Sequence, residues 1–251
     1  MILTAPFGSA RTRLLLLDIE GTTTPIEFVY KTLFPFASAG AEAFLNEHGA
    51  DEEIRPLVEA LHAQREMDAR QSSGVPEWVE TTGRERAVSA AAYVRWLIVK
   101  DSKFTALKSL QGKIWEAGYR SGELRGEVYA DVAPAFTRWR LQGRRLAIFS
   151  SGSVLAQKLL FAHSTAGNLT EFLDGYFDTT TGPKREAESY RRIAAAVGVT
   201  PAETLFLSDA IGELDAAREA GMATALCVRP GVRAPEETTH LPIRSFDEVF
   251  P

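Results

Sequence analysis

Four consecutive leucines, at positions 14–17, end directly at an acidic turn and constrain the fold more than any other stretch of the chain. The run is too short to cross a membrane and too uniformly apolar for an edge strand. It therefore predicts a central strand of a parallel sheet, covered on both faces. Asp18, Glu20 and Gly21 follow at its carboxyl end, the edge where open α/β sheets bind ligands. Taken alone, the stretch is explained equally well as a strand that ends in a polar turn.

The remainder of the chain predicts an α/β core that is interrupted by helices. From residue 131 onward, predicted helices alternate with apolar strands at 145–149, 176–178, 204–207 and 223–228. Such alternation is typical of a doubly wound parallel sheet with right-handed crossovers. Residues 28 to about 124 instead carry apolar side chains at helical spacing. We therefore predict a Rossmann-like core formed by residues 1–27 and 126–251, with a helical cap domain inserted at 28–125.

Composition and charge exclude several classes of protein. The chain has 251 residues and a net charge of −5, which argues against general binding of nucleic acids or anionic membranes. An anionic substrate stays possible, because a local cation can override the net field. No apolar run approaches the roughly 20 residues of a membrane helix, and the N-terminus lacks a signal-peptide pattern. The single cysteine, Cys227, excludes an internal disulfide and suits a reducing compartment. We therefore expect a cytoplasmic protein, and a monomer because no interface signal stands out.

Polar groups also follow the later predicted strands. Ser150 and Ser151 come after the second strand, and Lys184 stands between the third strand and the helix expected from residue 185. Asp209 follows the strand at 204–207, with Glu213 four residues further on. A serine at such a turn is commonly a helix N-cap, and most lysines are simply solvated. A lysine near a helix N-terminus opposes the helix dipole, however, which favours an anion facing it.

These groups are expected to meet at one edge of the sheet, because parallel strands all end on the same side. Asp18 and Asp209 offer carboxylate oxygens, the ligands that suit Mg²⁺. The four histidines are scattered and show no zinc-like spacing: His48, His62, His163 and His240. The residues at this edge therefore suit a hard cation such as Mg²⁺, beside a lysine and hydroxyl groups that could face an anion.

With these residues in place, the chain resembles the haloacid dehalogenase superfamily of phosphoryl-transfer enzymes. The acid, serine, lysine and terminal acid motifs occur in the order of that superfamily. Longer stretches, residues 18–29, 149–161, 207–209 and 228–231, are similar to the enolase-phosphatase (acireductone synthase) family of methionine salvage. Most superfamily members have aspartate two residues after the nucleophile, whereas this chain has Glu20, as that family does.

The resemblance implies a bifunctional reaction. The substrate would be 2,3-diketo-5-methylthiopentyl-1-phosphate, which the enzyme enolises and then dephosphorylates. The product would be the acireductone 1,2-dihydroxy-3-keto-5-methylthiopentene, formed through an aspartyl-phosphate. Residue chemistry does not identify the base for enolisation, for which Glu20 and a cap residue are candidates.

By the same resemblance, each motif receives a role. Asp18 would be nucleophile and Mg²⁺ ligand, and Asp209 a second ligand. Glu20 would bind the metal through its backbone oxygen and transfer protons with its side chain. Lys184 would neutralise the forming aspartyl-phosphate, and Glu213 is a candidate for a position beside the metal ligands. Phosphate or substrate binding would fall to Ser150 and Ser151.

Three other functions compete with this one. A phosphatase of the same fold for another small ester would share the core residues and lack enolase activity. A dehalogenase would need neither Mg²⁺ nor an acid in the role of Glu20. A non-catalytic binding module has no chemical reason to retain Asp18, Lys184 and Asp209 together. The aromatic residues of the inserted helices could line a substrate pocket, although most are more simply the core of that domain: Trp78, Tyr93, Trp96, Trp115 and Tyr119.

Overall fold

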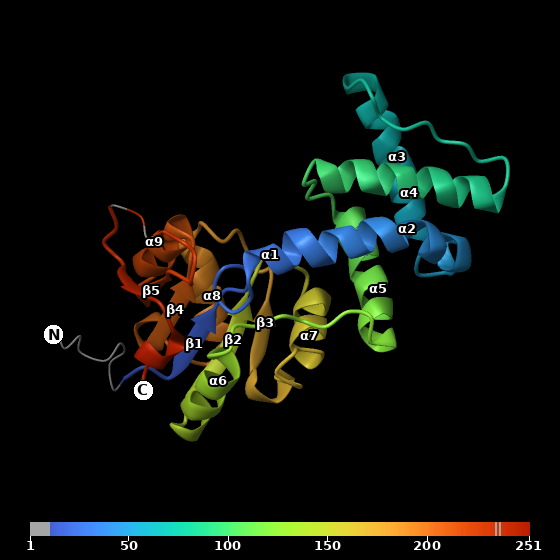
Figure 1. Cartoon of the computed structure of the whole chain (residues 1–251). Helices are drawn as coiled ribbons and strands as arrows, with labels where there is room; N and C mark the ends of the chain where they lie inside the picture. The colour runs from blue at the N-terminus through green and yellow to red at the C-terminus, as the bar shows by residue number, and fades with distance from the viewer. Residues whose placement is uncertain (1–10, 234, 236) are drawn as a thin grey trace. The chain divides into compact units, whose positions relative to one another are not determined.

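The protein forms two compact units that are built from three stretches of the chain. The computed structural model describes residues 11–233, 235 and 237–251. One unit comprises the chain up to Ile26 together with Arg125–Pro251, and the other comprises Glu27–Leu124 (Figure 1). The first ten residues, on which the expectation of no signal peptide depends, lie outside the described part of the chain.

The first unit is built on a parallel sheet of six strands in the order β3-β2-β1-β4-β5-β6. All five neighbouring pairs are parallel. The predicted α/β fold with a central leucine strand is thus confirmed. The strands are β1 (Leu14–Leu17), β2 (Arg145–Phe149), β3 (Gly175–Phe177), β4 (Thr204–Ser208), β5 (Ala223–Cys227) and β6 (Leu241–Ile243). The sequence did not predict β6, because this short segment contains a proline, which a sheet tolerates at its edge.

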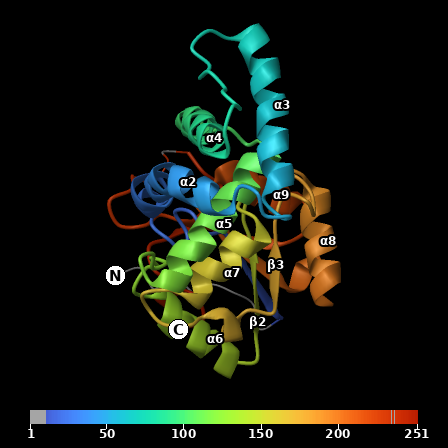
Figure 2. The same cartoon turned by 90° about the vertical axis from the view of Figure 1, so that its right-hand side faces the viewer.

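Helices cover both faces of this sheet. Side chains alternate along a strand, so Leu14 and Leu16 pack among residues of α8 and α9 on one face. On the other face, α6 contacts β2 and α7 contacts β3. Figure 2 shows β3 between α7 and α8. The helices are α6 (Val132–Leu141), α7 (Val154–Ala162), α8 (Ala187–Val197) and α9 (Ile211–Glu219), and short 3₁₀ turns occur at Thr170–Phe172, Pro201–Glu203 and Phe246–Glu248.

The strand order places a topological switch point beside β1. The chain proceeds from β1 to β2 and β3 on one side, then returns to β4 on the other side of β1. Leu17 is in register with Ile148 of β2 and with Leu207 of β4. The residues that follow these three strands therefore emerge side by side at one edge, which is where doubly wound sheets bind ligands.

The second unit is helical. It contains α1 (Ile26–Phe28), a π-helical turn (Val29–Leu33), α2 (Phe34–His48), α3 (Arg55–Gln71), α4 (Gly83–Val99) and α5 (Thr105–Ser121). The sequence did not predict the π-helical turn. At its end, the indole nitrogen of Trp115 donates a hydrogen bond to the carbonyl of Leu33 at 2.8 Å. Tyr93, Trp115 and Tyr119 are buried, so these three aromatic residues are core side chains of the unit, as the simpler interpretation has it.

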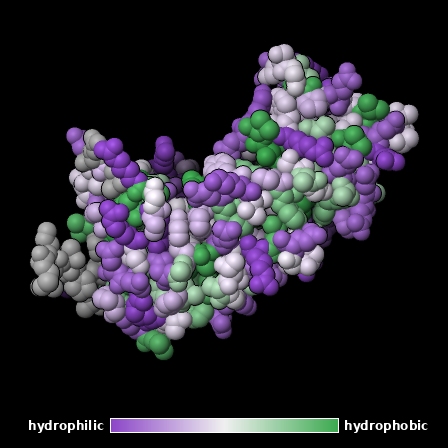
Figure 3. All heavy atoms as spheres, in the orientation of Figure 1, coloured by the Kyte–Doolittle hydropathy of each residue, from purple (hydrophilic) through white to green (hydrophobic). Residues whose placement is uncertain are grey.

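The described surface is mixed in polarity. On the face drawn in Figure 3, hydrophilic and hydrophobic residues are interspersed. Large apolar side chains that are exposed, such as Val99, Leu141 and Leu241, belong to different elements. Among the described helices, none combines the length and the apolar character needed to span a bilayer.

Candidate active site

A buried lysine joins two carboxylates at the switch-point edge of the sheet. Asp18 follows β1 and is 3 % exposed, and Lys184 is 9 % exposed. The Lys184 Nζ lies 2.7 Å from Asp18 Oδ1 and 2.7 Å from Glu213 Oε2. The hydroxyl of Ser208, at the end of β4, lies 3.2 Å from Asp18 Oδ2 and 3.2 Å from Glu213 Oε2. Four side chains from three separate parts of the sequence thus form one cluster.

Lys184 lies before α8, although the helix starts two residues later than the predicted start at residue 185. The helix α8 begins at Ala187, with Glu186 as its N-cap residue, so Lys184 lies in the turn before it. The sequence alone placed the helix start slightly early, because the ends of helices are the least sharply defined part of a sequence pattern. The lysine faces anions for another reason, which is its direct contact with Asp18 and Glu213.

The backbone of Lys184 is also held in place. The hydroxyl of Tyr190 donates a hydrogen bond to the Lys184 carbonyl at 2.7 Å. Tyr190 is a fully buried side chain of α8, and its ring packs edge-on against Phe149 with centroids 5.4 Å apart. A side chain of α8 that packs against the sheet therefore holds the backbone of the turn that carries Lys184.

The pKa values of the acids at this edge are strongly perturbed. Burial, followed by repulsion from Asp18, raises the pKa of Glu20 to about 7 and that of Asp209 to about 6. Burial and Asp18 also raise the pKa of Glu213 to about 8, against the opposing effect of Lys184. Groups that share such effects lie close together, so Glu20 and Asp209 belong to the same electrostatic cluster as Asp18. Perturbation of this kind is typical of functional sites.

Lys184 responds in the opposite sense to its neighbours. Burial alone would lower the pKa of its ammonium group, but the carboxylates of Asp18 and Glu213 outweigh burial and raise that pKa. The lysine is therefore a permanent cation at neutral pH. One cation faces four acids, Asp18, Glu20, Asp209 and Glu213, which leaves an excess of negative charge when all are ionised.

A glycine allows Asp209 to approach the turn after β1. Gly21 has a φ of +68°, and a β-carbon placed there would lie 2.2 Å from Asp209 Oδ2. The turn itself is tight, because the amides of Thr22, Thr23 and Thr24 all donate to the carbonyl of Ile19. Only glycine adopts this backbone conformation without strain while leaving room for the carboxylate.

We expect Gly21→Ala to lower activity far more than strain alone would explain. A left-handed alanine costs about 1–2 kcal/mol of stability, and the new methyl group must also displace Asp209. Gly143→Ala is the matched control, because Gly143 has a φ of +77° with nothing within 4 Å of the added carbon. Thermal unfolding should show similar losses for both variants, whereas catalytic activity should fall by about tenfold or more only for Gly21→Ala. Equal activities in the two variants would contradict a functional role for this close approach.

The two predicted substrate-binding serines lie at the same edge, after β2. Ser150 is buried, its amide donates to the carbonyl of Phe177 at 3.1 Å, and its hydroxyl accepts from the amide of Gly152 at 3.1 Å. Ser151 is exposed. The N-cap of α7 is Ser153, which accepts from the amide of Ala156. Ser153 is therefore the helix cap, and helix capping does not explain the presence of Ser150 and Ser151.

Sequence reasoning missed three residues that hold the site. Ser208 lies between two carboxylates, Tyr190 holds the turn of Lys184, and Arg229 binds the turn after β1 through the carbonyl of Thr22. Ser208 and Arg229 do belong to the short stretches 207–209 and 228–231 that carry the family resemblance. Tyr190 has only the apolar periodicity of a helix, which marks it as a core residue and nothing more.

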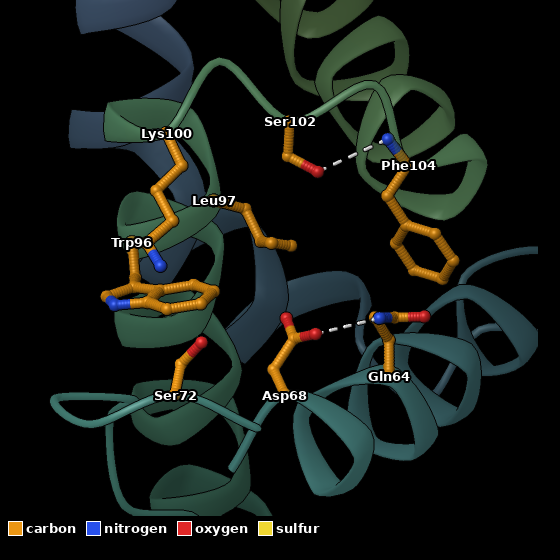
Figure 4. A pocket seen from close by; sticks show the side chains of 8 residues that line it. All are labelled: Gln64, Asp68, Ser72, Trp96, Leu97, Lys100, Ser102 and Phe104. Carbon is orange, nitrogen blue, oxygen red and sulfur yellow. Dashed lines mark hydrogen bonds between the residues drawn. The ribbon is translucent and has the colours of Figure 1, made fainter. Parts of the chain in front are cut away.

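The helical unit has a hollow of its own, with a volume of about 350 Å³ (Figure 4). Trp96, one of the aromatic residues considered for a pocket, lines it, and the ammonium of Lys100 lies 3.8 Å from the centroid of its ring. On the facing side, Gln64 donates to Asp68 at 2.9 Å. The hollow combines an aromatic ring, a cation and a carboxylate, of which the cation already lies over the ring and the carboxylate already accepts from Gln64.

Comparison with known proteins agrees with this geometry. Residues 12–221 match the model of the haloacid dehalogenase-like hydrolases. Enolase-phosphatase E1 of Synechococcus elongatus is 52% identical over 235 residues, which are 94% of this chain and 96% of the relative. Enolase-phosphatase E1 of Sorangium cellulosum is 48% identical over 239 residues, 95% and 97% of the two chains. The crystal structure of UTR4 protein from Saccharomyces cerevisiae is similar with a TM-score of 0.76 and 34% identity, over 94% of this chain and 99% of that one.

The extent and the identity of these matches decide the family. The chain belongs to the haloacid dehalogenase-like hydrolases and, within them, to the enolase-phosphatase E1 family. Both levels of the resemblance predicted from the sequence are confirmed.

Proposed function

We propose that this hydrolase is a bifunctional enolase-phosphatase of methionine salvage. It converts 2,3-diketo-5-methylthiopentyl-1-phosphate to 1,2-dihydroxy-3-keto-5-methylthiopentene and phosphate. The observation that carries the proposal is the buried contact of Lys184 with Asp18 at the switch-point edge of the sheet. The family relationship adds the enolase half of the reaction.

The residues of the cluster divide the phosphatase chemistry among them. Asp18 attacks phosphorus, and the resulting aspartyl-phosphate splits one difficult displacement into two. Lys184 lies against the carboxylate that attacks and holds a positive charge where negative charge develops. Glu20 protonates the leaving oxygen and then activates water, and its pKa of about 7 suits a group that must exchange protons near neutral pH.

The donor set at this edge fits Mg²⁺. Asp18 and Asp209 would hold the ion through carboxylate oxygens, and Glu20 would hold it through its backbone oxygen. Because Gly21 has no β-carbon, Asp209 Oδ2 can lie directly against the turn that contains Glu20. Among the described residues there is no cluster of three or more histidine, cysteine, aspartate or glutamate side chains arranged to hold a metal. Two carboxylates and a carbonyl are nevertheless sufficient, because Mg²⁺ commonly keeps several water ligands.

When bound there, Mg²⁺ would supply positive charge to offset the phosphate and the excess acids. Ser150 and Ser151 would bind phosphate or substrate from the neighbouring strand end. We propose that the unit with the sheet is the catalytic core and that the helical unit is the cap domain of this enzyme. We further propose that the enzyme is cytoplasmic and acts as a monomer.

Ultraviolet absorbance during incubation with the diketo phosphate tests this function directly, with phosphate release measured in parallel. We expect an enol-type absorbance and phosphate release in the presence of Mg²⁺, and loss of phosphate release after chelation. Readdition of Mg²⁺ to the chelated enzyme is the control that separates metal removal from denaturation. Phosphate release from other esters, without reaction of the diketo phosphate, would leave the Asp18 chemistry standing and would make the protein a phosphatase of different specificity.

A further inference from the structure

We infer that Arg229 is a positioning residue that holds the turn carrying Glu20 in its working conformation. The inference rests on the proposed phosphatase chemistry at Asp18 and deepens it. Arg229 lies just after β5 and is 2 % exposed. It does not contact the cluster formed by Asp18 and Lys184 through any of its described hydrogen bonds, so it acts on the reaction through the turn.

The guanidinium group connects the segment after β5 with the turn that contains Thr22 and with Asp131. Its Nε and Nη2 donate to the carbonyl of Thr22 at 2.8 and 2.6 Å, and its Nη1 donates to Asp131 Oδ2 at 2.5 Å. The rings of Tyr129 and Phe246 lie against it, with centroids 4.4 and 4.3 Å from the guanidinium carbon. All three nitrogens of the group thus donate to protein acceptors, and two aromatic rings pack against it.

The carbonyl that Arg229 binds belongs to a turn that cannot satisfy it internally. Three amides of the turn, those of Thr22, Thr23 and Thr24, donate to the carbonyl of Ile19, and the amide of Gly21 donates to the carbonyl of Thr24 at 2.8 Å. These bonds leave the carbonyls of Thr22 and Thr23 to be bound by donors from outside the turn. Thr22 O receives the arginine, and Thr23 O receives the amide of Tyr129 at 3.0 Å. Two consecutive carbonyls are therefore held from outside, immediately after Glu20 and Gly21.

Charge does not explain the arginine, because Asp131 neutralises it locally. A buried ion pair contributes little net stability compared with apolar packing, and this one adds no net charge to the acidic cluster. Geometry does explain it. Only a planar fork can bind a carbonyl through two nitrogens and a carboxylate through the third, whereas a lysine is a point charge that serves fewer fixed directions.

Arg138 provides a matched control for a purely structural role. Its Nε donates to the carbonyl of Phe250 at 2.9 Å, and its Nη2 donates to the carbonyl of Phe246 at 2.8 Å. Arg229 packs against the same C-terminal segment through the ring of Phe246. The described hydrogen bonds of Arg138 go to that segment and not to the turn at 19–24.

The test compares Arg229→Lys with Arg138→Lys in the full chain. Both variants should lower the thermal unfolding midpoint. Below both midpoints, Arg229→Lys should lower kcat by about 10- to 100-fold, because a small misplacement of catalytic groups has effects of that order. KM should change by less than about threefold, and Arg138→Lys should leave kcat within about threefold of wild type. Formation of the phosphoenzyme in a single turnover should slow in parallel with kcat in Arg229→Lys.

A fall in kcat no larger in Arg229→Lys than in Arg138→Lys would overturn the inference. Should Arg229→Lys fail to fold, the double variant Arg229→Met/Asp131→Asn removes the charged pair without leaving either charge unpaired. It should show the same loss of kcat, and a kcat within about threefold of wild type would likewise overturn the inference.

The proposed substrate is tested separately, with the wild-type enzyme alone. If it hydrolyses only p-nitrophenyl phosphate, the variants are compared on that ester, so failure of the proposed substrate and failure of the Arg229 role are read separately.

Discussion

Asp18→Asn is expected to lower phosphate release by about 10⁴-fold or more, the order of loss that follows removal of a covalent nucleophile. An amide oxygen is a poor nucleophile toward phosphorus, and it is also a weaker ligand for a divalent cation. The wild-type enzyme should form a phosphoenzyme that survives acid quenching and can be captured in a single turnover. The variant should form none. Steady-state phosphate release and phosphoenzyme capture on the same preparations measure both effects.

The Asp18→Asn protein should remain folded. The amide has nearly the same size as the carboxylate, and Lys184 keeps its contact with Glu213. Asp174→Asn is a suitable control. Asp174 precedes β3 at the opposite edge of the sheet and pairs with Arg140 at 2.5 Å. That variant should lose stability at most and keep its turnover. Substantial phosphatase activity in a folded Asp18→Asn protein would refute the covalent mechanism.

Lys184→Ala is expected to have the second largest effect, a loss of about 10²–10³-fold or more in phosphate release. The ammonium group lies 2.7 Å from the attacking carboxylate of Asp18 and 2.7 Å from Glu213. Its removal takes away the cation that stabilises developing charge. It also leaves two buried carboxylates facing each other without a counter-charge, so we expect a lower unfolding midpoint as well.

Loss of stability and loss of catalysis can be separated for Lys184→Ala. Activity should be measured well below the unfolding midpoint, with the folded fraction checked by circular dichroism. Lys158→Ala is the matched control, since Lys158 is an exposed residue of α7 in the same unit, and it should change the rate by less than about threefold. An equally small change in Lys184→Ala would mean that the lysine has only a structural role.

The comparisons and the site do not support the competing functions equally. Relatives at 52% and 48% identity over nearly the whole chain carry the name enolase-phosphatase E1, which supports neither a dehalogenase nor a binding module. The close group of Asp18, Lys184 and Glu213 agrees with an enzyme, because burying these charges together has no benefit for a passive fold. A phosphatase with another substrate is the alternative that the absorbance experiment addresses.

Much of the fold could be predicted from the order of residues. The leucine run indicated a strand covered on both faces, and all four leucines of β1 are fully buried. Alternation of strands and helices indicated the parallel sheet. Acidic residues after β1 and β4 indicated the edge at which the site lies, because strands of a parallel sheet all end on one side. These signals are local, so a sequence carries them without knowledge of the distant contacts.

The contacts that complete the site depend on the tertiary structure. Arg229 and Thr22 are separated by 207 positions, and Ser208 and Asp18 by 190, so no local pattern records that they touch. The helix after Lys184 was predicted to start at residue 185, whereas α8 begins at Ala187. Lys184 in the preceding turn is held by contacts with Asp18, Glu213 and Tyr190, which no local pattern records.

The sequence by itself thus determined which residue types stand at the carboxyl end of each strand. Folding of the core decided which of them lie close together, and burial, followed by repulsion from Asp18, raises the pKa values of Glu20, Asp209 and Glu213. The physical reason is that burial and charge repulsion depend on distances of a few ångströms, and only packing of the sheet against its helices brings these groups that close.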